Sequence, residues 1–202
     1  ATFVHEANSV PGRANRWLAP WVRQAFVYFP MATGGLHQRR AFVTGMPVRP
    51  QVQPMDPPSC RAMLGLDPAR PVLLITGGSQ GASAVNDLVV QALPVWSSRA
   101  AHWQYLHLTG PKDCAATQEH YARLGLRAVV RPFLTEMELA LHAANAAVSR
   151  AGASSVAELA ALRVPSLLIP YPTAADNHQY FNAMALVETG AARMVTQSVA
   201  TP

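Results

Sequence analysis

The sequence from residue 146 to residue 183, AAVSRAGASSVAELAALRVPSLLIPYPTAADNHQYFNA, alternates short apolar runs with polar loops. Apolar runs at 146–149 and 166–169 flank a helical pattern at 154–163, and a further helix opens at residue 176. Strand, glycine turn, helix, strand and helix follow one another in doubly wound α/β domains, whose ligands lie at the carboxyl ends of the strands. We therefore expect the functional residues in these loops.

The same alternation predicts the rest of the fold. After residue 70, five or six strands alternate with helices, so we expect one parallel sheet with right-handed crossovers. The strands expected there are 71–76, 103–108, 128–130, 146–149, 166–169 and 192–195, and the helices are 82–93, 113–124, 135–143 and 154–163. Before residue 70 we expect strands at 2–5, 25–29 and 41–43, helices at 12–21 and 59–64, and a turn at Gly34-Gly35.

A proline-rich stretch separates two domains. Four prolines and almost no periodicity occur between residues 50 and 58, which is typical of a linker. We assign residues 1–50 to the end of one domain, 51–70 to the linker and a first helix, and 71–202 to a second, incomplete domain. The chain begins without Met inside an expected strand and ends just after another, so we expect an internal piece of a longer protein.

Composition excludes several classes of function. Half of the 202 residues are hydrophobic, which is ample for a core. The net charge of +5 comes almost wholly from scattered arginines, which argues against a nucleic-acid surface but suits anionic ligands. Cys60 and Cys114 lack any zinc-ligand spacing and are expected to be free thiols in a reducing compartment. No apolar run approaches the ~18–20 residues of a membrane helix, and no signal peptide is visible.

Gly77-Gly78-Ser79-Gln80-Gly81 follows the first strand of the second domain directly and leads into a helix. Glycines allow the backbone to approach a ligand closely, and the free N–H groups of a first helical turn favour phosphate. The pattern is neither G-x-G-x-x-G nor a Walker A loop, so it indicates neither a dinucleotide nor ATP. A phosphate site and a turn built only for packing both remain open.

Two further clusters carry polar groups at expected helix starts. In the stretch 152–158, Glu158 could accept both hydroxyls of a ribose, but Ser155 and Glu158 also have the spacing of a capping box. In the stretch 176–182, amide and imidazole groups suit sugar hydroxyls, and N-capping by Asp176 or Asn177 is the alternative. No metal site is expected in either stretch. The run His5-Glu6-Ala7-Asn8 reads by itself as a solvated turn.

Together these residues resemble one family. The blocks HEANSVPGRANRWLA, TGMPVR, LLITGGSQGASAVN, PFLTEM, SRAGASSVAELAALRVPSLLIPYP and DNHQYFNA are similar, in this order, to the successive motifs of the MurG family. That family transfers N-acetylglucosamine from UDP-N-acetylglucosamine to undecaprenyl-diphospho-muramoyl-pentapeptide, which converts lipid I to lipid II. The resemblance covers essentially the whole chain. It implies an inverting GT-B glycosyltransferase without a cofactor, with a Rossmann-like parallel sheet in its C-terminal domain and the end of an N-terminal Rossmann-like domain.

The resemblance also assigns nucleotide contacts. Ser79 would contact the donor diphosphate, Leu134 would pair its backbone with uracil, and Arg49 would reach the nucleotide. Residues 153–158 would surround phosphate and ribose, with Glu158 on the ribose hydroxyls. The members of this segment are Ala153, Ser154, Ser155, Val156, Ala157 and Glu158.

The resemblance assigns contacts with the sugar and the acceptor to a second set of residues. The resemblance implies that Gln179, aided by Asn182, reads the sugar hydroxyls, and that Asn8 faces the donor sugar and the acceptor across the cleft. Ala7 and Met46 stand where the family usually has amides, HEQN and GNPVR.

The catalytic residue is expected outside this sequence. The family's glycine-rich N-terminal block with its histidine, the expected source of the general base, would lie upstream of Ala1. The closing C-terminal helices of the family would likewise lie beyond Pro202. The resemblance therefore assigns substrate-binding residues to this chain but no catalytic base.

Function and location follow from the resemblance as expectations. The whole protein would take part in peptidoglycan synthesis, and so in cell wall biogenesis, cell shape and cell division, as a peripheral protein on the cytoplasmic face of the bacterial inner membrane. Its membrane contact would lie in the missing N-terminal part, and this piece alone would be inactive. The alternatives are a GT-B transferase with another lipid acceptor and a non-catalytic UDP-sugar binding module.

Overall fold

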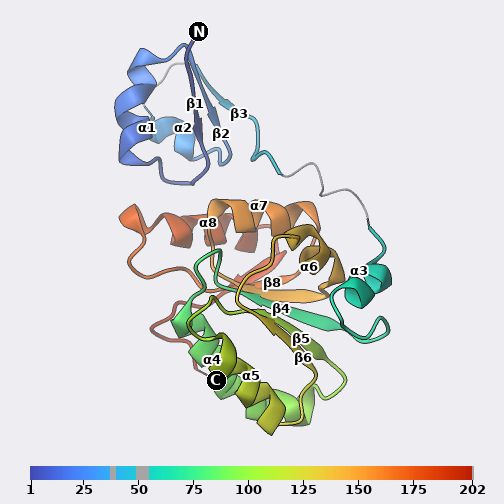
Figure 1. The fold of residues 1–202 in the computed structure, drawn as a ribbon. Helices are drawn as coiled ribbons and strands as arrows, with labels where there is room; N and C mark the ends of the chain where they lie inside the picture. The colour runs from blue at the N-terminus through green and yellow to red at the C-terminus, as the bar shows by residue number, and fades with distance from the viewer. Residues whose placement is uncertain (37–39, 49–54, 202) are drawn as a thin grey trace.

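The computed structural model describes residues 1–36, 40–48 and 55–201 and places their strands in two parallel sheets (Figure 1). The smaller sheet, of order β1-β2-β3, belongs to an N-terminal unit, residues 1–48, and the larger, of order β6-β5-β4-β7-β8-β9, to a C-terminal unit, residues 55–201. All neighbouring strands pair in parallel. The prediction of a parallel sheet of five or six strands after residue 70 is therefore confirmed.

The element bounds agree with most of the predictions. The strands are β1 (Phe3–Glu6), β2 (Gln24–Val27), β3 (Ala41–Val43), β4 (Val72–Thr76), β5 (Gln104–Leu108), β6 (Ala128–Arg131), β7 (Ala146–Ser149), β8 (Ser166–Leu168) and β9 (Ala192–Met194). The α-helices are α1 (Arg13–Leu18), α2 (Ala32–Gly35), α3 (Pro57–Met63), α4 (Ser83–Arg99), α5 (Cys114–Arg123), α6 (Met137–Ala143), α7 (Ala153–Ala161) and α8 (His178–Val187). Short 3₁₀ turns, η1 (Ala19–Trp21) and η2 (Ala175–Asn177), adjoin α1 and α8.

The strand predicted at the start of the chain begins one residue later than expected. Ala1 and Thr2 precede β1, whose first residue is Phe3, and both are exposed. Strand β1 then pairs with β2 from Phe3 to Glu6. Ala1 therefore lies just before the smaller sheet. The general base was expected upstream of Ala1, and the structure does not test that expectation.

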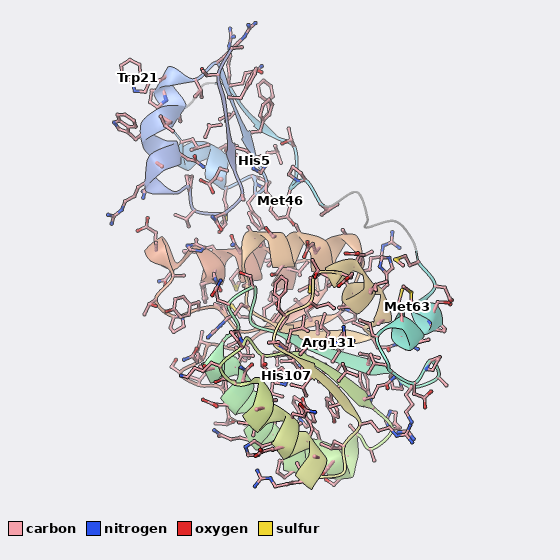
Figure 2. All side chains as sticks on the ribbon, viewed as in Figure 1. His5, Trp21, Met46, Met63, His107 and Arg131 are labelled. Atoms are coloured by element: carbon pink, nitrogen blue, oxygen red, sulfur yellow. The ribbon has the colours of Figure 1, made fainter. Side chains whose placement is uncertain are left out.

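Helices cover both faces of the larger sheet (Figure 1). Alternate strand residues such as Leu74 and Leu106 form a core with α3, α6, α7 and α8 on one face. The intervening residues Ile75 and Tyr105 pack with α4 and α5 on the other face, where His107, labelled in Figure 2, also lies. Strand β4 is largely buried on both sides, and its sequence is accordingly apolar from Val72 to Ile75 rather than alternating.

Three local predictions were wrong. The expected turn at Gly34-Gly35 is the end of α2, where Gly35 packs closely against the Pro11 ring. The helix expected to stop at residue 93 continues through Pro94 to Arg99, because Trp96 stacks on Tyr105 and holds the later turns to the core. Helix α6 begins at Met137, two residues later than expected, with Glu136 at its N-cap.

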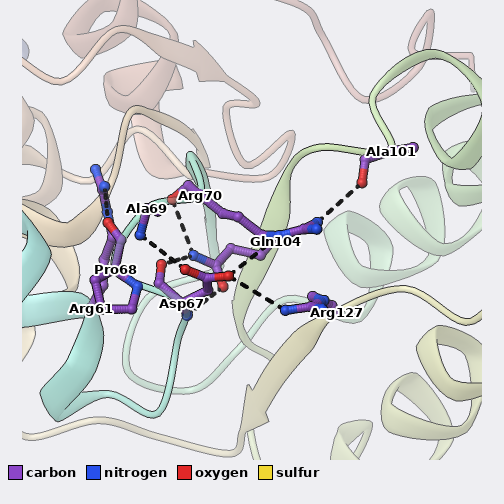
Figure 3. A network of polar contacts seen from close by, with 8 residues as sticks. All are labelled: Arg61, Asp67, Pro68, Ala69, Arg70, Ala101, Gln104 and Arg127. Atoms are coloured by element: carbon purple, nitrogen blue, oxygen red, sulfur yellow. Dashed lines mark hydrogen bonds and ion pairs between the residues drawn. The ribbon is translucent and has the colours of Figure 1, made fainter.

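A polar network fastens the amino end of β5 to the segment before β4 (Figure 3). Gln104, 1% exposed, accepts a 2.9 Å hydrogen bond from the Asp67 backbone N–H and donates to the backbone carbonyls of Asp67 and Arg70 at 2.6 and 3.1 Å. The Asp67 carboxylate lies 3.4 Å from both Arg70 and Arg127. These bonds hold the inner strands at the end of the sheet opposite the polar loops.

Replacing Gln104 with leucine should destabilise the C-terminal unit strongly. The change leaves one backbone N–H and two carbonyls without this partner, and each unsatisfied buried group costs about 1–3 kcal/mol. Allowing for partial solvation, we expect a loss of about 2–4 kcal/mol in the free energy of unfolding, measured by urea denaturation. Ser97→Ala, which removes an exposed hydroxyl bond to Pro94, is the control and should change little. Equal effects of the two changes would contradict this role for Gln104.

Burial also makes His107 sensitive to acid. The ring is fully buried, and this desolvation lowers its pKa from 6.5 to about 3, although Asp113 opposes the shift. Between these two values the unfolded chain binds a proton that the folded chain does not, so stability falls as the pH drops below 6.5. At pH 5 the loss due to this group should be about 2 kcal/mol.

The measurement compares the wild type with His107→Gln by urea denaturation at about pH 7 and about pH 5. Because glutamine does not titrate, the difference in unfolding free energy between the two proteins should shift by about 2 kcal/mol against the wild type. A difference that stays constant with pH would show that His107 does not remain neutral in the folded state.

Candidate functional site

Five of the predicted site residues line one cavity at the carboxyl ends of β4, β5 and β7. This strand-end cavity has a volume of about 280 Å³. Thr76, Leu108 and Ser149, the last residues of the three strands, form part of its wall. The predicted residues around it are Ser79, Leu134, Ser154, Ser155 and Glu158. Segments separated by up to about 80 residues in the sequence therefore meet where the fold class places ligands.

The glycine loop between β4 and α4 is shaped by close backbone contacts. A Cβ on Gly77 would lie 2.4 Å from the Ala82 nitrogen, and one on Gly81 would lie 2.2 Å from the Thr109 carbonyl oxygen. Gly78 has no such neighbour, but its φ of +91° favours glycine, and it lines the cavity beside Ser79. Packing thus explains Gly77 and Gly81, while Gly78 and Ser79 face the cavity. Phosphate contact at this loop remains a prediction.

Helix α7 begins earlier than the sequence predicted. Its N-cap is Gly152 and its first residue is Ala153, so Ser155 lies in the first turn and Glu158 in the second. The capping box of Ser155 and Glu158 is therefore wrong. The helix starts here because the Gly152 carbonyl accepts the Val156 N–H at 2.9 Å. Spaced three apart, Ser155 and Glu158 share one helix face, which lines the cavity.

The other members of this segment divide between cavity and core. Ser154 also lines the cavity. Ala153, Val156 and Ala157 are buried, at 8%, 1% and 5% exposure, and Val156 belongs to the hydrophobic core. Ligand contact by these three residues stays a prediction, one that their side chains do not support. Arg49, the remaining predicted nucleotide contact, lies outside the described residues.

Gln179 lines a second cavity, of about 400 Å³, which shares the glycine loop with the first. Gly77 and Gly81 line this second cavity, whereas Gly78 and Ser79 line the strand-end cavity. The Gln179 Oε1 accepts a 3.0 Å hydrogen bond from the Tyr171 backbone N–H. The amide is thereby oriented so that its NH₂ group is the part that can reach a ligand.

Arg150 lines the second cavity and was missed by the sequence analysis. It is 7% exposed and donates to the carbonyls of Ile169 and Pro170, both at 3.1 Å, and to Gln197 Oε1 at 2.8 Å. Its guanidinium lies 5.4 Å from the centre of the Tyr171 ring. Burial lowers the pKa of this guanidinium. An arginine directly after the buried strand β7 is the signal that could have identified it.

Asn182 and Asn8 link the two units instead of facing these cavities. Asn182 is completely buried; its Nδ2 donates to Asn8 Oδ1 and to the Ala151 carbonyl, both at 3.1 Å, and its Oδ1 accepts the Ser9 N–H at 2.8 Å. Among the described residues that line the two cavities, neither asparagine occurs. Their contacts with sugar and acceptor stay predictions.

Two further residues lie near this link. Asp176 pairs with Arg16 of the N-terminal unit at 2.7 Å instead of capping α8. Asn177 occupies the N-cap position, as the alternative allowed, but in a left-handed conformation and without a capping hydrogen bond from its side chain. The solvated turn expected at residues 5–8 is wrong. Glu6 is 2% exposed and accepts four hydrogen bonds, from Asn8, Gly12 and Asn15, which fix this loop against α1.

Other expectations concern metals, membranes and thiols. Cys60 and Cys114 are free thiols, as expected. Within the part of the chain that the structure describes, no group of three or more His, Cys, Asp or Glu side chains could hold a metal ion. Across the same residues, every helix is too short or too polar to cross a bilayer.

Comparison with curated proteins gives consistent relatives. The chain is 39% identical over its whole length to the UDP-N-acetylglucosamine–N-acetylmuramyl-(pentapeptide) pyrophosphoryl-undecaprenol N-acetylglucosamine transferase of Syntrophotalea carbinolica, of which it covers 54%. It is 43% identical to the Sorangium cellulosum transferase of the same name, with 98% of this chain and 48% of that protein aligned. The chain therefore spans about half the length of these relatives.

Solved structures agree on the fold. The crystal structure of Acinetobacter baumannii MurG superposes with a TM-score of 0.74 and 29% identity, over 99% of this chain and 55% of that one. A UDP-glucose:anthocyanidin 3-O-glucosyltransferase, 16% identical, superposes with a TM-score of 0.59 over 89% of this chain and 42% of its own, and supports the fold alone. The GT-B fold class and the MurG-family resemblance are thereby confirmed. The glycosyltransferase family 28 C-terminal domain matches residues 72–202, well over half of the sequence, and the chain belongs to that family.

Proposed function

We propose that this chain contains the nucleotide-sugar donor site of a glycosyltransferase that moves N-acetylglucosamine from UDP-N-acetylglucosamine to undecaprenyl-diphospho-muramoyl-pentapeptide. The names of its relatives state this donor sugar and this acceptor. The observation that carries the proposal is the strand-end cavity, in which Ser79, Leu134 and Glu158 meet. Residues 71–202 would form the donor domain, residues 51–70 its linker and first helix, and residues 1–50 the end of the acceptor-side domain.

Each part of the donor has a chemically suitable partner. A ribose places two hydroxyl donors together, and the Glu158 carboxylate accepts from both when ionised. The diphosphate suits the glycine loop and the first turn of α4, whose N–H groups point to the loop. The uracil would lie against the backbone at Leu134. The sugar would then reach the second cavity, where the NH₂ group of Gln179 can donate to a hydroxyl oxygen.

The transfer itself requires groups beyond this site. Inversion at the anomeric carbon needs a general base to deprotonate the acceptor hydroxyl. We assign that base to no residue of this chain and place it upstream of Ala1 in the whole protein. Charge that develops on the departing UDP would be stabilised by the N–H groups of the glycine loop and α4 without a bridging metal. This piece alone would therefore bind the donor and transfer nothing.

Membrane contact is the second part of the proposal. The acceptor is lipid-linked, so the whole protein would work at the cytoplasmic face of the inner membrane as a peripheral protein of peptidoglycan synthesis, and so of cell shape and division. The N-terminal unit of this chain would add to the membrane contact expected upstream of it, because Trp17 and Trp21 are 73% and 79% exposed and Trp21 points away from the unit in Figure 2. The nearby Arg13 and Arg23 are also exposed, and tryptophan with arginine is typical of protein surfaces at lipid headgroups.

The direct test is calorimetric titration of the 202-residue chain with UDP, UDP-N-acetylglucosamine and ADP, each with magnesium and with EDTA. We expect both uridine nucleotides to bind, ADP to bind much more weakly, and EDTA to change little, because backbone N–H groups hold the diphosphate. Binding of ADP as tight as that of UDP would argue against a uracil site. Strict dependence on magnesium would contradict the proposed diphosphate site.

Glu158→Gln tests the ribose contact. Charge-assisted hydrogen bonds contribute ~1.5–3 kcal/mol, and glutamine presents an NH₂ group to the second hydroxyl, so the affinity for UDP should fall by roughly 10- to 100-fold. The melting temperature should hardly change, because glutamine keeps the shape of the side chain and Gly152, not Glu158, occupies the N-cap of the helix. Glu119→Gln, the same change on the exposed surface of α5, is the matched control and should bind UDP normally.

A 2′,3′-dideoxy analogue of UDP completes this test. Since it lacks both hydroxyls, it should bind the wild type and Glu158→Gln about equally. Equal binding of UDP and its dideoxy analogue to the wild type would show that Glu158 does not hold the ribose.

A further inference from the structure

A chain of hydrogen bonds runs through the core behind the glycine loop. His107 on β5 lies between Tyr121 of α5 and Asn86 of α4, with its Nδ1 3.2 Å from the Tyr121 hydroxyl and its Nε2 3.0 Å from Asn86 Oδ1. All three side chains are at most 2% exposed. Asn86 Nδ2 continues the chain to the Thr109 carbonyl at 2.9 Å and to the Asp113 carboxylate at 2.8 Å. None of these residues lines the strand-end cavity, judged by its described lining residues.

The partners at one end fix the hydrogen positions along the whole chain. The Thr109 carbonyl and the Asp113 carboxylate can only accept, so both must face the NH₂ group of Asn86. The Asn86 oxygen then faces His107, whose Nε2 must carry the hydrogen. Nδ1 is left as an acceptor and takes the hydrogen of the Tyr121 hydroxyl. A single arrangement, a neutral imidazole with its hydrogen on Nε2, satisfies every member.

The chain of hydrogen bonds ends directly beneath the glycine loop, residues 77–81. The Thr109 carbonyl that Asn86 holds is the group against which Gly81 packs, since a Cβ on Gly81 would lie 2.2 Å from that oxygen. In the same way, a Cβ on Gly110 would lie 2.7 Å from the Gln80 carbonyl oxygen. Asp113 also accepts a hydrogen bond from Ser83, the first residue of α4, which helps to lower the pKa of that carboxylate. Asn86 therefore fixes both the carbonyl under the loop and the carboxylate at the start of α4.

We propose that His107 is a positioning residue for the phosphate site: its Nε2–H holds the Asn86 amide in the orientation that fixes Thr109, Gly81 and the first turn of α4. The inference rests on the proposed function for its ligand, the diphosphate of a nucleotide sugar. His107 never touches that ligand. It acts through Asn86, and its contribution is the pre-ordered geometry of the loop, which spares binding the cost of ordering backbone N–H groups.

Two substitutions at His107 separate positioning from packing. Glutamine can place an NH₂ group where Nε2 stands and donate to Asn86, whereas leucine fills the space without a donor. We expect His107→Leu to weaken UDP binding roughly 5- to 20-fold by calorimetry, and His107→Gln to restore most of it. Uridine, which lacks phosphate, should bind all three proteins alike. If uridine binding falls by the same factor as UDP binding, or His107→Leu binds UDP like the wild type, the inference is overturned.

Amide hydrogen exchange without ligand keeps the test independent of the proposed function. Exchange at residues 78–84 should rise in His107→Leu and return toward the wild-type rate in His107→Gln. Failure of the wild type to bind UDP would refute the proposed function, while the exchange rates would still decide whether His107 orders the loop. Unchanged exchange in His107→Leu overturns the positioning role.

The hydrogen position can be measured in the wild type, so the inference stays testable even if His107→Leu does not fold. The ¹⁵N spectrum of the imidazole should show a neutral ring with its hydrogen on Nε2 and an acceptor at Nδ1. A hydrogen on Nδ1 would require Asn86 to be turned over and would overturn the inference. As a further variant, Asn86→Asp keeps an acceptor for His107 but loses both donors, and it should weaken UDP binding at least as much as His107→Leu.

Discussion

The backbone contact between Gly81 and the segment Thr109-Gly110 is the constraint on which the site depends. A Cβ on Gly81 or Gly110 would lie 2.2–2.7 Å from the backbone of the opposite loop. The loops after β4 and β5 can therefore meet in this way only because both residues are glycines. This contact places the glycine loop between the two cavities, with Gly78 and Ser79 on one and Gly77 and Gly81 on the other. The strand order then brings β7 and α7 beside β4, so that Glu158 faces the same space as Ser79.

Much of the fold could be predicted because its signals are local. The inner strands of the larger sheet include apolar runs that are largely buried on both faces, and runs such as Val72–Thr76 stand out in the sequence. Predictions failed where tertiary contacts override local rules. Proline usually ends a helix, but α4 continues through Pro94 to Arg99, and Trp96 beyond the proline stacks on Tyr105 of the core. The division at residue 50 stays a prediction, since residues 49–54 lie outside the described part of the chain.

The candidate site was predictable in its loops but not in the partners of its side chains. Ser79, Leu134 and Glu158 were placed by the rule that ligands bind at strand ends and by the family resemblance, and the structure brings them together. The partners of the buried side chains of Arg150 and Asn182 lie far away in the sequence, and no local pattern reveals them. Asn182, for example, bonds residues more than 170 positions away. No periodicity reveals such a contact, because its partners are defined only once the two units have met.

A crystal structure of this chain with UDP would test the central claim, a nucleotide-sugar site at the carboxyl ends of β4, β5 and β7, most directly. The account predicts the nucleotide in the strand-end cavity, with both ribose hydroxyls within hydrogen-bond distance of Glu158, the uracil beside the backbone at Leu134, and the diphosphate against Gly78 and Ser79. A nucleotide bound elsewhere on the chain, or in this cavity with its ribose away from Glu158, would contradict it.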